Sequence, residues 1–461
     1  MIRINVADVI DQSRLRPFQI LVLVLCGLCM IMDGFDVQAM GYVAPALIKD
    51  WHITKTALGP VFGAGLLGIM IGSLGLSIVA DSIGRRPVLI AAMLFLAIGM
   101  FATAYASTIN KLFVLRFVTG LAMGAIIPNA MALAGEFSPA KFRVTLMMIV
   151  SSGFIIGGAI GGGVSALLIP AFGWRAVFYA GAIAPLVIAA VMFVAMPESL
   201  QFLVLHGRHL EKVRAWLGRI DPATRADAGT EFSVPERGKK GMPVANLFRN
   251  GMATGTLLLW AINFMNLLCA YFLANWLPVV MNEAGHSGSQ AVLAGTTLWI
   301  GGIVGNLLLG WFVDRRGFGP VLTATFFIGA IAIAAIGQVA GSLTTAFVVI
   351  AVAGFCVLGA QSGLNALGPT YYPVSVRSTG TGWASGIGRF GSIFGPVVGG
   401  ELMRLNWSTG ELFQIAAVPA SVAVLAMFAF WHVVKLPKRA EAPSAIPQAV
   451  PVVPAAPAEN R

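Results

Sequence analysis

The sequence predicts an all-α integral membrane protein, with twelve transmembrane helices in two pseudo-symmetric halves of six. The chain of 461 residues is 57% hydrophobic and only 11% charged, with a mean hydropathy of +0.85, a balance unlike that of a soluble domain. Apolar stretches of about 20 residues, long enough to span a bilayer, recur along the whole chain. A charge-rich segment near the middle separates two groups of six.

The expected elements follow a regular order along the chain. An N-terminal tail (1–17) precedes the first half (18–196), and a central loop (197–252) precedes the second half (253–434). We expect the last segment (435–461), rich in Ala and Pro without helical periodicity, to be disordered. The spans are expected near 18–44, 57–80, 87–106, 112–136, 145–168, 175–196, 253–278, 292–313, 320–340, 345–369, 379–402 and 411–434.

The two halves repeat at an offset of 233 or 234 residues. The repeated motifs are the loop Asp81-x-x-Gly84-Arg85-Arg86 with Asp314-Arg315-Arg316, Pro139-x-x-x-Arg143 with Pro373-x-x-x-Arg377, and Gly157-x-x-x-Gly161 with Gly391-x-x-x-Gly395. Shared offsets of this kind indicate a duplicated six-helix unit. In transporters of that architecture the substrate site lies between the halves, near the bilayer midplane.

The net charge of +11 reflects membrane topology rather than binding to nucleic acid. Of the 30 Lys and Arg residues, 23 lie in segments that would share one side of the membrane, and five lie on the other side. Arg116 and Arg389 fall inside spans. The positive-inside asymmetry places both termini and the central loop in the cytoplasm.

The sequence offers no motif for enzymatic chemistry. We find no phosphate-binding loop, no cluster of metal ligands and no nucleophile with its base. The pair Cys26-x-x-Cys29 lies in the middle of an apolar span without polar neighbours, so we interpret both cysteines as packing residues. We therefore expect neither an enzyme nor a bound metal or cofactor.

Two acids mark the first span. Asp33 and Asp36 lie in a run that is otherwise nearly uncharged, and a carboxylate near the bilayer centre costs about 2.5–3.5 kcal/mol. At a spacing of three residues both acids lie on one helix face, which must then face a water-filled cavity or a cation. Either they pair with an arginine and lock helices together, or they line a transport path and carry a proton; we favour the second interpretation.

The short loop after the second span is predicted to be a gate. Gly84 permits a tight turn, and Asp81 can bond to a helix N-terminus or to an arginine across the interface between the halves. Such a contact would stabilise one orientation of the halves and break in the other. The remaining gating candidates are the basic and acidic residues of the repeated motifs: Arg85, Arg86, Asp314, Arg315, Arg143 and Arg377.

These features resemble the major facilitator superfamily over nearly the whole chain. The loop motif, the internal repeat, the central loop and Pro197-Glu198-Ser199 after the sixth span are all similar to it. In the fourth span, Arg116-x-x-x-Gly120-x-x-x-Gly124 resembles the superfamily motif whose arginine is tied to proton coupling. The resemblance implies the major facilitator fold.

A closer resemblance is to the aromatic acid:proton symporter family. Asp33-Gly34-Phe35-Asp36 is similar to that family's first span, although Phe35 stands where a tyrosine is common. The second matching segment runs from Tyr372-Pro373 through Arg377-Ser378-Thr379-Gly380-Thr381-Gly382-Trp383 to Gly388-Arg389-Phe390-Gly391. The resemblance implies uptake of benzoate-like or hydroxylated aromatic carboxylates across the bacterial inner membrane.

The two arginines within spans need buried partners. Arg389 lies well inside the eleventh span, where a guanidinium must be paired, and its planar fork suits a carboxylate. It binds the substrate carboxylate or, alternatively, pairs permanently with backbone carbonyls or an acid such as Asp33. Arg116 lies at a depth similar to that of Asp36, so we expect those two to form a pair whose charge balance changes with protonation.

Further candidates complete the expected site. Glu136, at the cytoplasmic end of the fourth span, is either a gate acid near Arg143 or part of the proton path. Trp383 contacts the substrate or, alternatively, anchors its helix at the membrane surface. The candidates for the slot around an aromatic ring are polar or aromatic side chains of the seventh and tenth spans: Asn263, Asn266, Tyr271, Gln361 and Asn365.

The sequence thus predicts a monomeric transporter that couples uptake of an aromatic monocarboxylate to a proton by alternating access. The co-transported proton is the only small partner expected besides the substrate, and the bilayer surrounds the chain. Another organic anion or an organic cation is the alternative substrate, and Arg389 argues against the cation. A membrane sensor is the alternative of a different class, and we would expect it to carry a folded signalling domain.

Overall fold

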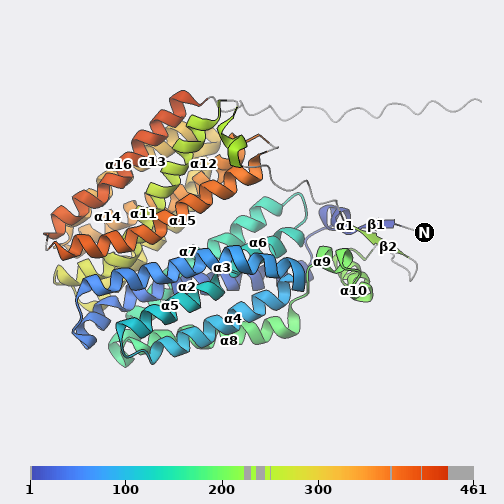
Figure 1. Ribbon diagram of the computed structural model, residues 1–461, viewed down its shortest axis with the longest axis horizontal. Coiled ribbons are helices and arrows are strands. Elements are labelled where there is room, and N and C mark those ends of the chain that lie inside the picture. Colours follow the sequence, from blue (N-terminus) through green and yellow to red (C-terminus); the bar gives the residue numbers. More distant parts are fainter. Residues whose placement is uncertain are drawn as a thin grey trace, which may run out of the picture.

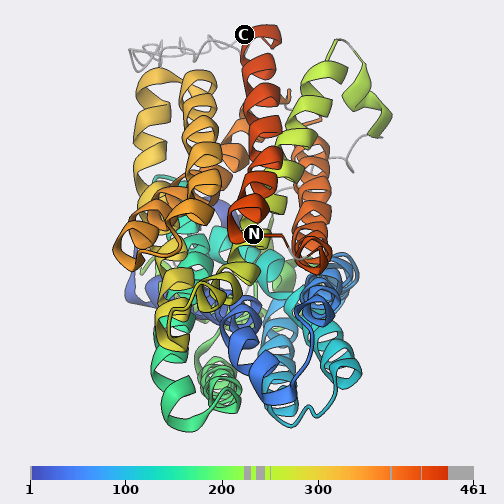
Figure 2. The same ribbon diagram turned by 90° about the vertical axis from the view of Figure 1, so that its left-hand side faces the viewer.

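The computed structural model describes residues 3–222, 230–234, 244–249, 251–373, 376–405 and 407–434. The expected disorder of 435–461 lies outside these residues. Long helices form two groups, which correspond to the two halves of the sequence (Figures 1 and 2). The groups meet at one end and diverge toward the other, which carries the short elements near the N-terminus (Figure 1).

The twelve predicted spans are present in the described chain, and most helices extend a few residues beyond the predicted limits. In the first half they are α2 (Pro17–Trp51), α3 (Leu58–Ile83), α4 (Arg85–Ala104), α5 (Ile109–Met123) continued by α6 (Ile126–Glu136), α7 (Arg143–Phe172) and α8 (Arg175–Ala195). In the second half they are α11 (Ala253–Glu283), α12 (Gly288–Arg316), α13 (Phe318–Val339), α14 (Leu343–Tyr371), α15 (Arg377–Arg404) and α16 (Thr409–Val433).

One of these helices differs from the others in composition. By length and apolar content, 11 spans of the described chain qualify as membrane-crossing, with α5 and α6 counted as one. The helix α15 has 28 residues and therefore the length to cross, but its sequence is rich in Gly and Ser and includes Arg389. It packs along α11 and α3, so its polar face turns toward protein rather than lipid.

Glycine seams hold the helices of each half together, and the seams obey the sequence repeat. A Cβ atom on Gly157 would lie 2.0 Å from the carbonyl oxygen of Ile31, where α7 crosses α2. At the equivalent place in the second half, a Cβ atom on Gly391 of α15 would lie 2.1 Å from the carbonyl oxygen of Phe264 in α11. Only glycine allows backbones to approach so closely.

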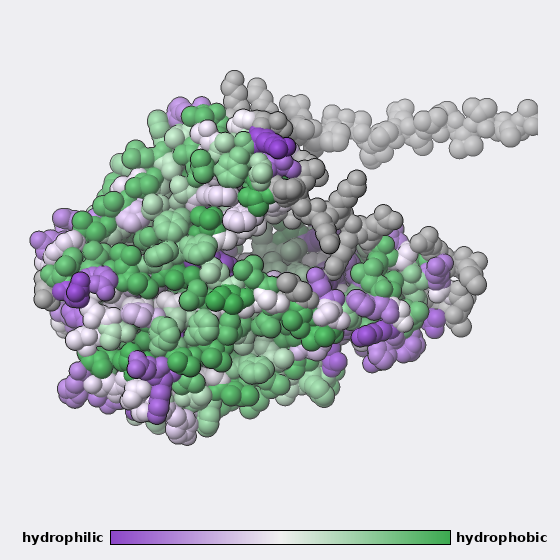
Figure 3. Space-filling model, in the orientation of Figure 1, coloured by the Kyte–Doolittle hydropathy of each residue, from purple (hydrophilic) through white to green (hydrophobic). Residues whose placement is uncertain are grey.

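The outer surface of both halves is apolar, as a lipid-facing surface requires. In Figure 3, hydrophobic residues cover the flanks of the helices, and hydrophilic residues gather toward the two ends. Individual side chains on this surface are almost fully exposed in the isolated chain, such as Val194 at 87% and Leu167 at 76%. The membrane supplies the environment that these side chains lack within the protein.

The N-terminal tail and the central loop fold together at the diverging end, where the sequence predicted a plain tail and a polar loop. They contribute β1 (Arg3–Asn5), α1 (Val6–Gln12), α9 (Leu200–Leu205), α10 (Leu210–Ile220), β2 (Glu231–Ser233) and the short helix η2 (Val244–Phe248). Strands β1 and β2 pair in parallel. Val213 and Leu217, spaced for one face of α10, are fully buried, so an amphipathic period was present within the charged loop.

The glycine seam generates a prediction about stability. Gly157→Ala should lower the thermal stability of the detergent-solubilised protein, because the new methyl group meets backbone rather than a flexible side chain. Overpacking of this kind typically costs about 1–3 kcal/mol. Gly163→Ala is the matched control on the same helix, since nothing lies within 4 Å of its Cβ position. An unchanged melting temperature for Gly157→Ala would show that α2 and α7 can move apart at this contact without loss of stability.

Candidate functional site

A cavity of about 440 Å³ lies between the two halves, within the size range of small-molecule sites. Residues of α2, α3, α6 and α7 line it from the first half, and residues of α11, α12, α14 and α15 from the second. The polar lining residues are Asp33, Ser151, Asn263, Tyr271, Asn306, Gln361, Ser362, Asn365, Thr381, Ser385, Arg389 and Ser392. The cavity thus lies where the duplicated architecture predicts it.

The cavity is closed at the end where the halves meet. There the side-chain amide of Gln38 donates a hydrogen bond to the carbonyl of Ala274, and the hydroxyl of Ser289 donates to the carbonyl of Ala166 at 3.2 Å. Lys55, in the short helix η1 (Lys55–Ala57), forms an ion pair with Glu283 of α11. All three contacts join one half to the other.

Toward the diverging end the cavity remains open. Its lining extends to Gly368, near the end of α14, and to Thr381, one turn into α15. Figure 3 shows the hollow between the halves on this side. The open end is therefore the one that carries α1, α9 and α10 (Figure 1).

Asp36 and Arg116 form the pair that the sequence predicted. Nη1 of Arg116 donates to Oδ1 of Asp36 at 2.9 Å, and Nη2 contacts Oδ2, so the contact is bidentate. The two side chains are 1% and 5% exposed. A void of about 20 Å³, lined also by Asn275 of α11, adjoins them and is large enough for one water molecule. Asp36 is thus neutralised within the first half.

Asp33 has different surroundings, although it lies only one turn away on α2. Its side chain is 1% exposed and lines the main cavity. Its Oδ1 atom accepts no hydrogen bond, and the carboxylate forms no ion pair, within the part of the chain that the structure describes. The charges that act on it are those of Asp36 and Arg389. Asp33 is therefore a buried acid without a committed partner.

Arg389 faces the same cavity from the second half. Its half-buried guanidinium makes no hydrogen bond or ion pair to any described residue. The permanent pair with Asp33, which was the alternative for this residue, is therefore not formed in this structure. The hydroxyl group of Tyr271 lies within the fields of both Asp33 and Arg389. The three side chains surround a gap at the interface between the halves.

The four predicted amides form one chain of hydrogen bonds. Nδ2 of Asn266 donates to Gln361 at 2.9 Å, and Nε2 of Gln361 donates to Asn365 at 3.2 Å and to Asn263 at 3.4 Å. Asn263, Gln361 and Asn365 line the cavity, whereas Asn266 lies behind Gln361 and holds its amide in place. Asn266 was expected at the substrate, but a spacing of three residues leaves it about 60° around α11 from Asn263, which is enough to take it off the cavity wall.

The walls also carry two aromatic side chains that were not predicted from the sequence. Phe154 of α7 and Trp299 of α12 come from opposite halves, with ring centroids 5.9 Å apart in an edge-to-face arrangement. Trp299 packs on Gly158, where a Cβ atom would lie 2.5 Å from the indole ring. The signal in the sequence was Gly158 itself, which makes room for a ring rather than for a helix.

The loop motif lies outside the cavity, beyond its open end. Gly84 adopts φ 107°, and the backbone N–H groups of Arg85 and Arg86 donate to Oε1 of Glu198 at 2.9 and 3.1 Å. The guanidinium of Arg85 forms an ion pair with Glu136 and donates to Ser199 at 3.1 Å. These contacts join the loop to α6 and to the segment after α8. The predicted contact of Asp81 across the interface between the halves stays a prediction.

Glu136 contacts the loop that was predicted to be a gate. Its carboxylate binds Arg85 and accepts a hydrogen bond from Ser199, and Arg143 donates to the carbonyl of the adjacent Gly135. Its role as a gate acid stays a prediction. Glu136 is not among the residues that line the cavity. The reason is the loop after α8, which returns Ser199 to the end of α6. Within the described chain, Glu136 thus lies at the loop after α3 and not beside the acids of α2.

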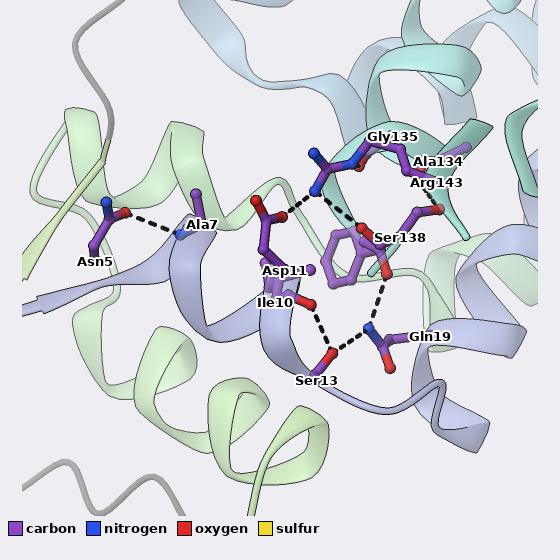
Figure 4. A network of polar contacts seen from close by, with 11 residues as sticks. Asn5, Ala7, Ile10, Asp11, Ser13, Gln19, Ala134, Gly135, Ser138 and Arg143 are labelled. Atoms are coloured by element: carbon purple, nitrogen blue, oxygen red, sulfur yellow. Dashed lines mark hydrogen bonds and ion pairs between the residues drawn. The ribbon is translucent and has the colours of Figure 1, made fainter. Parts of the chain in front are cut away.

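Arg143 instead joins α1 to the first half (Figure 4). It forms an ion pair with Asp11 and donates to the carbonyls of Gly135 and Ser138 at 3.1 and 3.0 Å. Its counterpart Arg377 donates to the carbonyl of Tyr372 at 3.3 Å. Both arginines thus bond to the chain that leaves the preceding span, as a repeated motif should.

The remaining predicted residues lie away from the cavity. Trp383 is 44% exposed and stacks on Trp260 at 5.8 Å near the open end, which favours the role of a membrane-surface anchor. Asp81 and Asp314 are exposed at the ends of α3 and α12. Arg315 stacks over the ring of Trp311 at 3.8 Å. None of the four is part of the cavity lining.

Comparison with known proteins decides the family. A family model described as Major Facilitator Superfamily matches residues 26–255 and 259–458. The chain belongs to the major facilitator superfamily. The 4-hydroxybenzoate transporter PcaK of Pseudomonas putida is 38% identical to it over 426 residues, covering 92% of this chain and 94% of the relative. The benzoate transport protein of Acinetobacter baylyi is 31% identical, covering 92% of each.

The predicted resemblance to the superfamily and to its aromatic acid transporters is thereby confirmed. Solved structures agree on the fold. A D-xylose-proton symporter superimposes with a TM-score of 0.70 at 17% identity, covering 91% of this chain and 98% of that structure. A bacterial homologue of the lysosomal transporter Spinster, in an inward-facing conformation, gives a TM-score of 0.71 at 15% identity, covering 91% and 98%. This family consists of transporters, not enzymes.

The buried ion pair yields a prediction. Asp36→Asn should destabilise the solubilised protein, because it leaves the guanidinium of Arg116 buried without a counter-charge, typically at a cost of about 3–5 kcal/mol. The double variant Asp36→Asn/Arg116→Gln removes both charges and should recover much of the loss in a thermal-shift assay. Asp50→Asn, at the exposed end of the same helix, is the control. Equal melting temperatures for Asp36→Asn and Asp50→Asn would contradict the assignment.

Proposed function

We propose that this protein is a symporter that takes up an aromatic monocarboxylate together with a proton by alternating access. The observation that carries the proposal is Arg389, a guanidinium without a partner among the described residues, in a cavity with aromatic walls. A half-buried cation in such a cavity is suited to an anion, and the aromatic side chains are suited to a ring. The names of the relatives, which are transporters of 4-hydroxybenzoate, gallate and benzoate, support the same substrate class.

The substrate carboxylate would bind Arg389, whose planar fork matches two carboxylate oxygens. The hydroxyl group of Tyr271 is a further donor beside it. The ring would lie toward Phe154 and Trp299, where edge and face contacts add about 0.5–1.5 kcal/mol beyond area burial. Polar ring substituents would meet the amide chain that includes Gln361. The amides would therefore select among aromatic acids by the substituents on the ring.

The direction of access follows from the distribution of charge. The open end of the cavity carries the segments rich in Lys and Arg, which the positive-inside rule assigns to the cytoplasm. The conformation is then inward-facing. The protein would lie in the bacterial inner membrane with both termini in the cytoplasm. Opening to the outside would separate Gln38 from Ala274 and Lys55 from Glu283. Each chain contains a complete cavity, so a monomer suffices for transport.

Proton coupling follows from the acids of α2. When the halves close over the substrate, water leaves the cavity and every remaining charge needs an opposite charge. The substrate anion offsets Arg389, and a proton bound to the acids offsets the negative charge that would otherwise remain. An organic cation would meet Arg389 directly, so repulsion disfavours that alternative.

The proposed function predicts the energy source. Proteoliposomes with an acidic exterior should accumulate 4-hydroxybenzoate, because a proton enters with each anion. A protonophore should abolish the accumulation, and a sodium gradient should not replace the proton gradient. Protein-free liposomes correct for passive entry of the neutral acid. Sodium-driven accumulation without a pH difference would refute proton coupling.

A further prediction concerns Arg389. Arg389→Lys keeps the charge but loses the fork, so the affinity for 4-hydroxybenzoate should fall roughly ten- to a hundredfold, the equivalent of about 1.5–3 kcal/mol. Arg389→Ala should bind it more weakly still. Arg404→Lys, on the same helix at an exposed ion pair with Glu401, is the matched control.

A ligand analogue makes this test specific. The corresponding amide, 4-hydroxybenzamide, lacks the negative charge and should compete poorly against the wild type. It should also lose much less affinity than the acid does when Arg389 is replaced by Ala. If the acid and the amide lose affinity equally, Arg389 holds the helices rather than the substrate.

A further inference from the structure

The two acids of α2 have unequal freedom to exchange a proton. The charge of Asp36 is committed to a bidentate contact with Arg116 in the same half. That contact lies behind the cavity wall formed by Val37, so a substrate does not reach it. Asp33 lines the cavity itself and has an oxygen without a hydrogen-bond partner. A change in the cavity therefore acts on Asp33 first.

The groups that face Asp33 come from few elements. Asp36 and Cys29 lie on its own helix, and Tyr271 of α11 and Arg389 of α15 act on it from the same cavity. Of the other helices packed on α2, the helices α3, α6, α7 and α12 carry ionisable side chains only in a terminal turn. The helix α8 carries them only near its start, at Arg175 and Tyr179, and α10 meets α2 near Phe18. Because Arg116 is engaged by Asp36, Arg389 is the cation that remains for Asp33 among the described residues.

The separation between Asp33 and Arg389 matters as much as their proximity. The charge of Arg389 acts on Asp33 in the same cavity. The guanidinium N atoms nevertheless lie beyond 4.0 Å, the limit for an ion pair, from the carboxylate O atoms. They also belong to opposite halves. The gap between them has two possible occupants of equal charge: the carboxylate of a ligand, or the Asp33 carboxylate after a small closing motion.

Resting on the proposed function, we propose that Asp33 and the substrate carboxylate are alternative counter-ions of Arg389, and that Asp33 carries the transported proton. In the empty carrier, ionised Asp33 neutralises Arg389. In the loaded carrier, the substrate anion neutralises Arg389, and Asp33 holds a proton taken from the outside. Release of substrate to the cytoplasm lets Asp33 return to Arg389 and give up that proton on the same side.

Charge balance enforces the coupling. Asp36 and Arg116 cancel in every state, so the net charge of the site depends on Asp33, Arg389 and the ligand. The empty ionised state and the loaded protonated state both sum to zero. A loaded carrier without the proton would enclose one negative charge, and a protonated carrier without substrate would enclose one positive charge. Both states resist closure because an uncompensated buried charge is costly.

A binding measurement tests the competition. For purified full-length wild type, the apparent Kd for 4-hydroxybenzoate should rise by about tenfold per pH unit in the range where Asp33 is ionised, since one proton is then taken up with each anion. For Asp33→Asn the Kd should be independent of pH. Asp33→Glu restores a titrating group and should restore the slope.

Two controls assign the effect. Asp50→Asn, and the charge-balanced double variant Asp36→Asn/Arg116→Gln, should both keep the wild-type slope. A flat profile for that double variant, or a wild-type profile without slope, would overturn the inference. A slope of about a hundredfold per pH unit would also overturn it, because two acids would then take up protons. If the wild type binds no aromatic acid at any pH, the proposed function fails instead.

Transport in proteoliposomes gives an independent readout. One proton with one anion moves no net charge, so a potassium diffusion potential imposed with valinomycin should neither drive nor slow uptake of 4-hydroxybenzoate. Uptake that follows an inside-negative potential would reveal a second proton and overturn the inference. Asp33→Asn should lose accumulation yet retain exchange of labelled for unlabelled substrate, because only its empty form carries an uncompensated charge.

Discussion

The cost of enclosing an uncompensated charge in a low-dielectric interior governs this molecule. The first half satisfies that constraint internally, through the contact between Asp36 and Arg116. The interface between the halves does not, because Asp33 and Arg389 face an open cavity without a shared ion pair among the described residues. Water in the open cavity can solvate Arg389, whereas Asp33 is only 1% exposed at the cavity wall. Closure removes that water, so the contents of the cavity determine whether closure is possible.

Packing divides the molecule into two rigid halves and an interface between them that can open. Glycine seams such as the one at Gly157 bring helix backbones of one half into direct contact, which leaves little room for sliding. The halves also pack closely in places, as where Gly41 approaches the carbonyl of Ala274 and Trp299 packs on Gly158. At the closed end they are joined as well by polar bonds such as those of Gln38 and Ser289. A rigid-body rotation breaks these bonds without disturbing either seam. The architecture therefore confines motion to the surface that holds the site.

The sequence predicted well what the bilayer imposes. Span positions follow from apolar length, and Asp36 was matched to Arg116 by depth alone. The sequence predicted poorly what depends on the rotation of a helix or on the path of a loop. Asn266 faces away from the cavity by part of a turn, and Glu136 meets Arg85 because the segment after α8 folds back.

Aromatic walls were the other omission. Phe154 and Trp299 look like any other apolar residue in a span, and only their meeting across the two halves distinguishes them. Hydropathy does not report which apolar face turns inward. The acids and arginines could be found because their burial requires an explanation, whereas a buried ring requires none.

The joining of the first residues to distant segments has a consequence for how the protein is made. Strand β1 pairs with Glu231–Ser233, and Asp11 binds Arg143 (Figure 4). The ribosome synthesises both partners long after the N-terminus: Arg143 begins the fifth span, and Glu231–Ser233 follow all six helices of the first half. The beginning of the chain must therefore wait, unassembled, at the membrane surface. Its docking marks the completion of the first half, and a bulky N-terminal fusion would interfere with assembly at that late step.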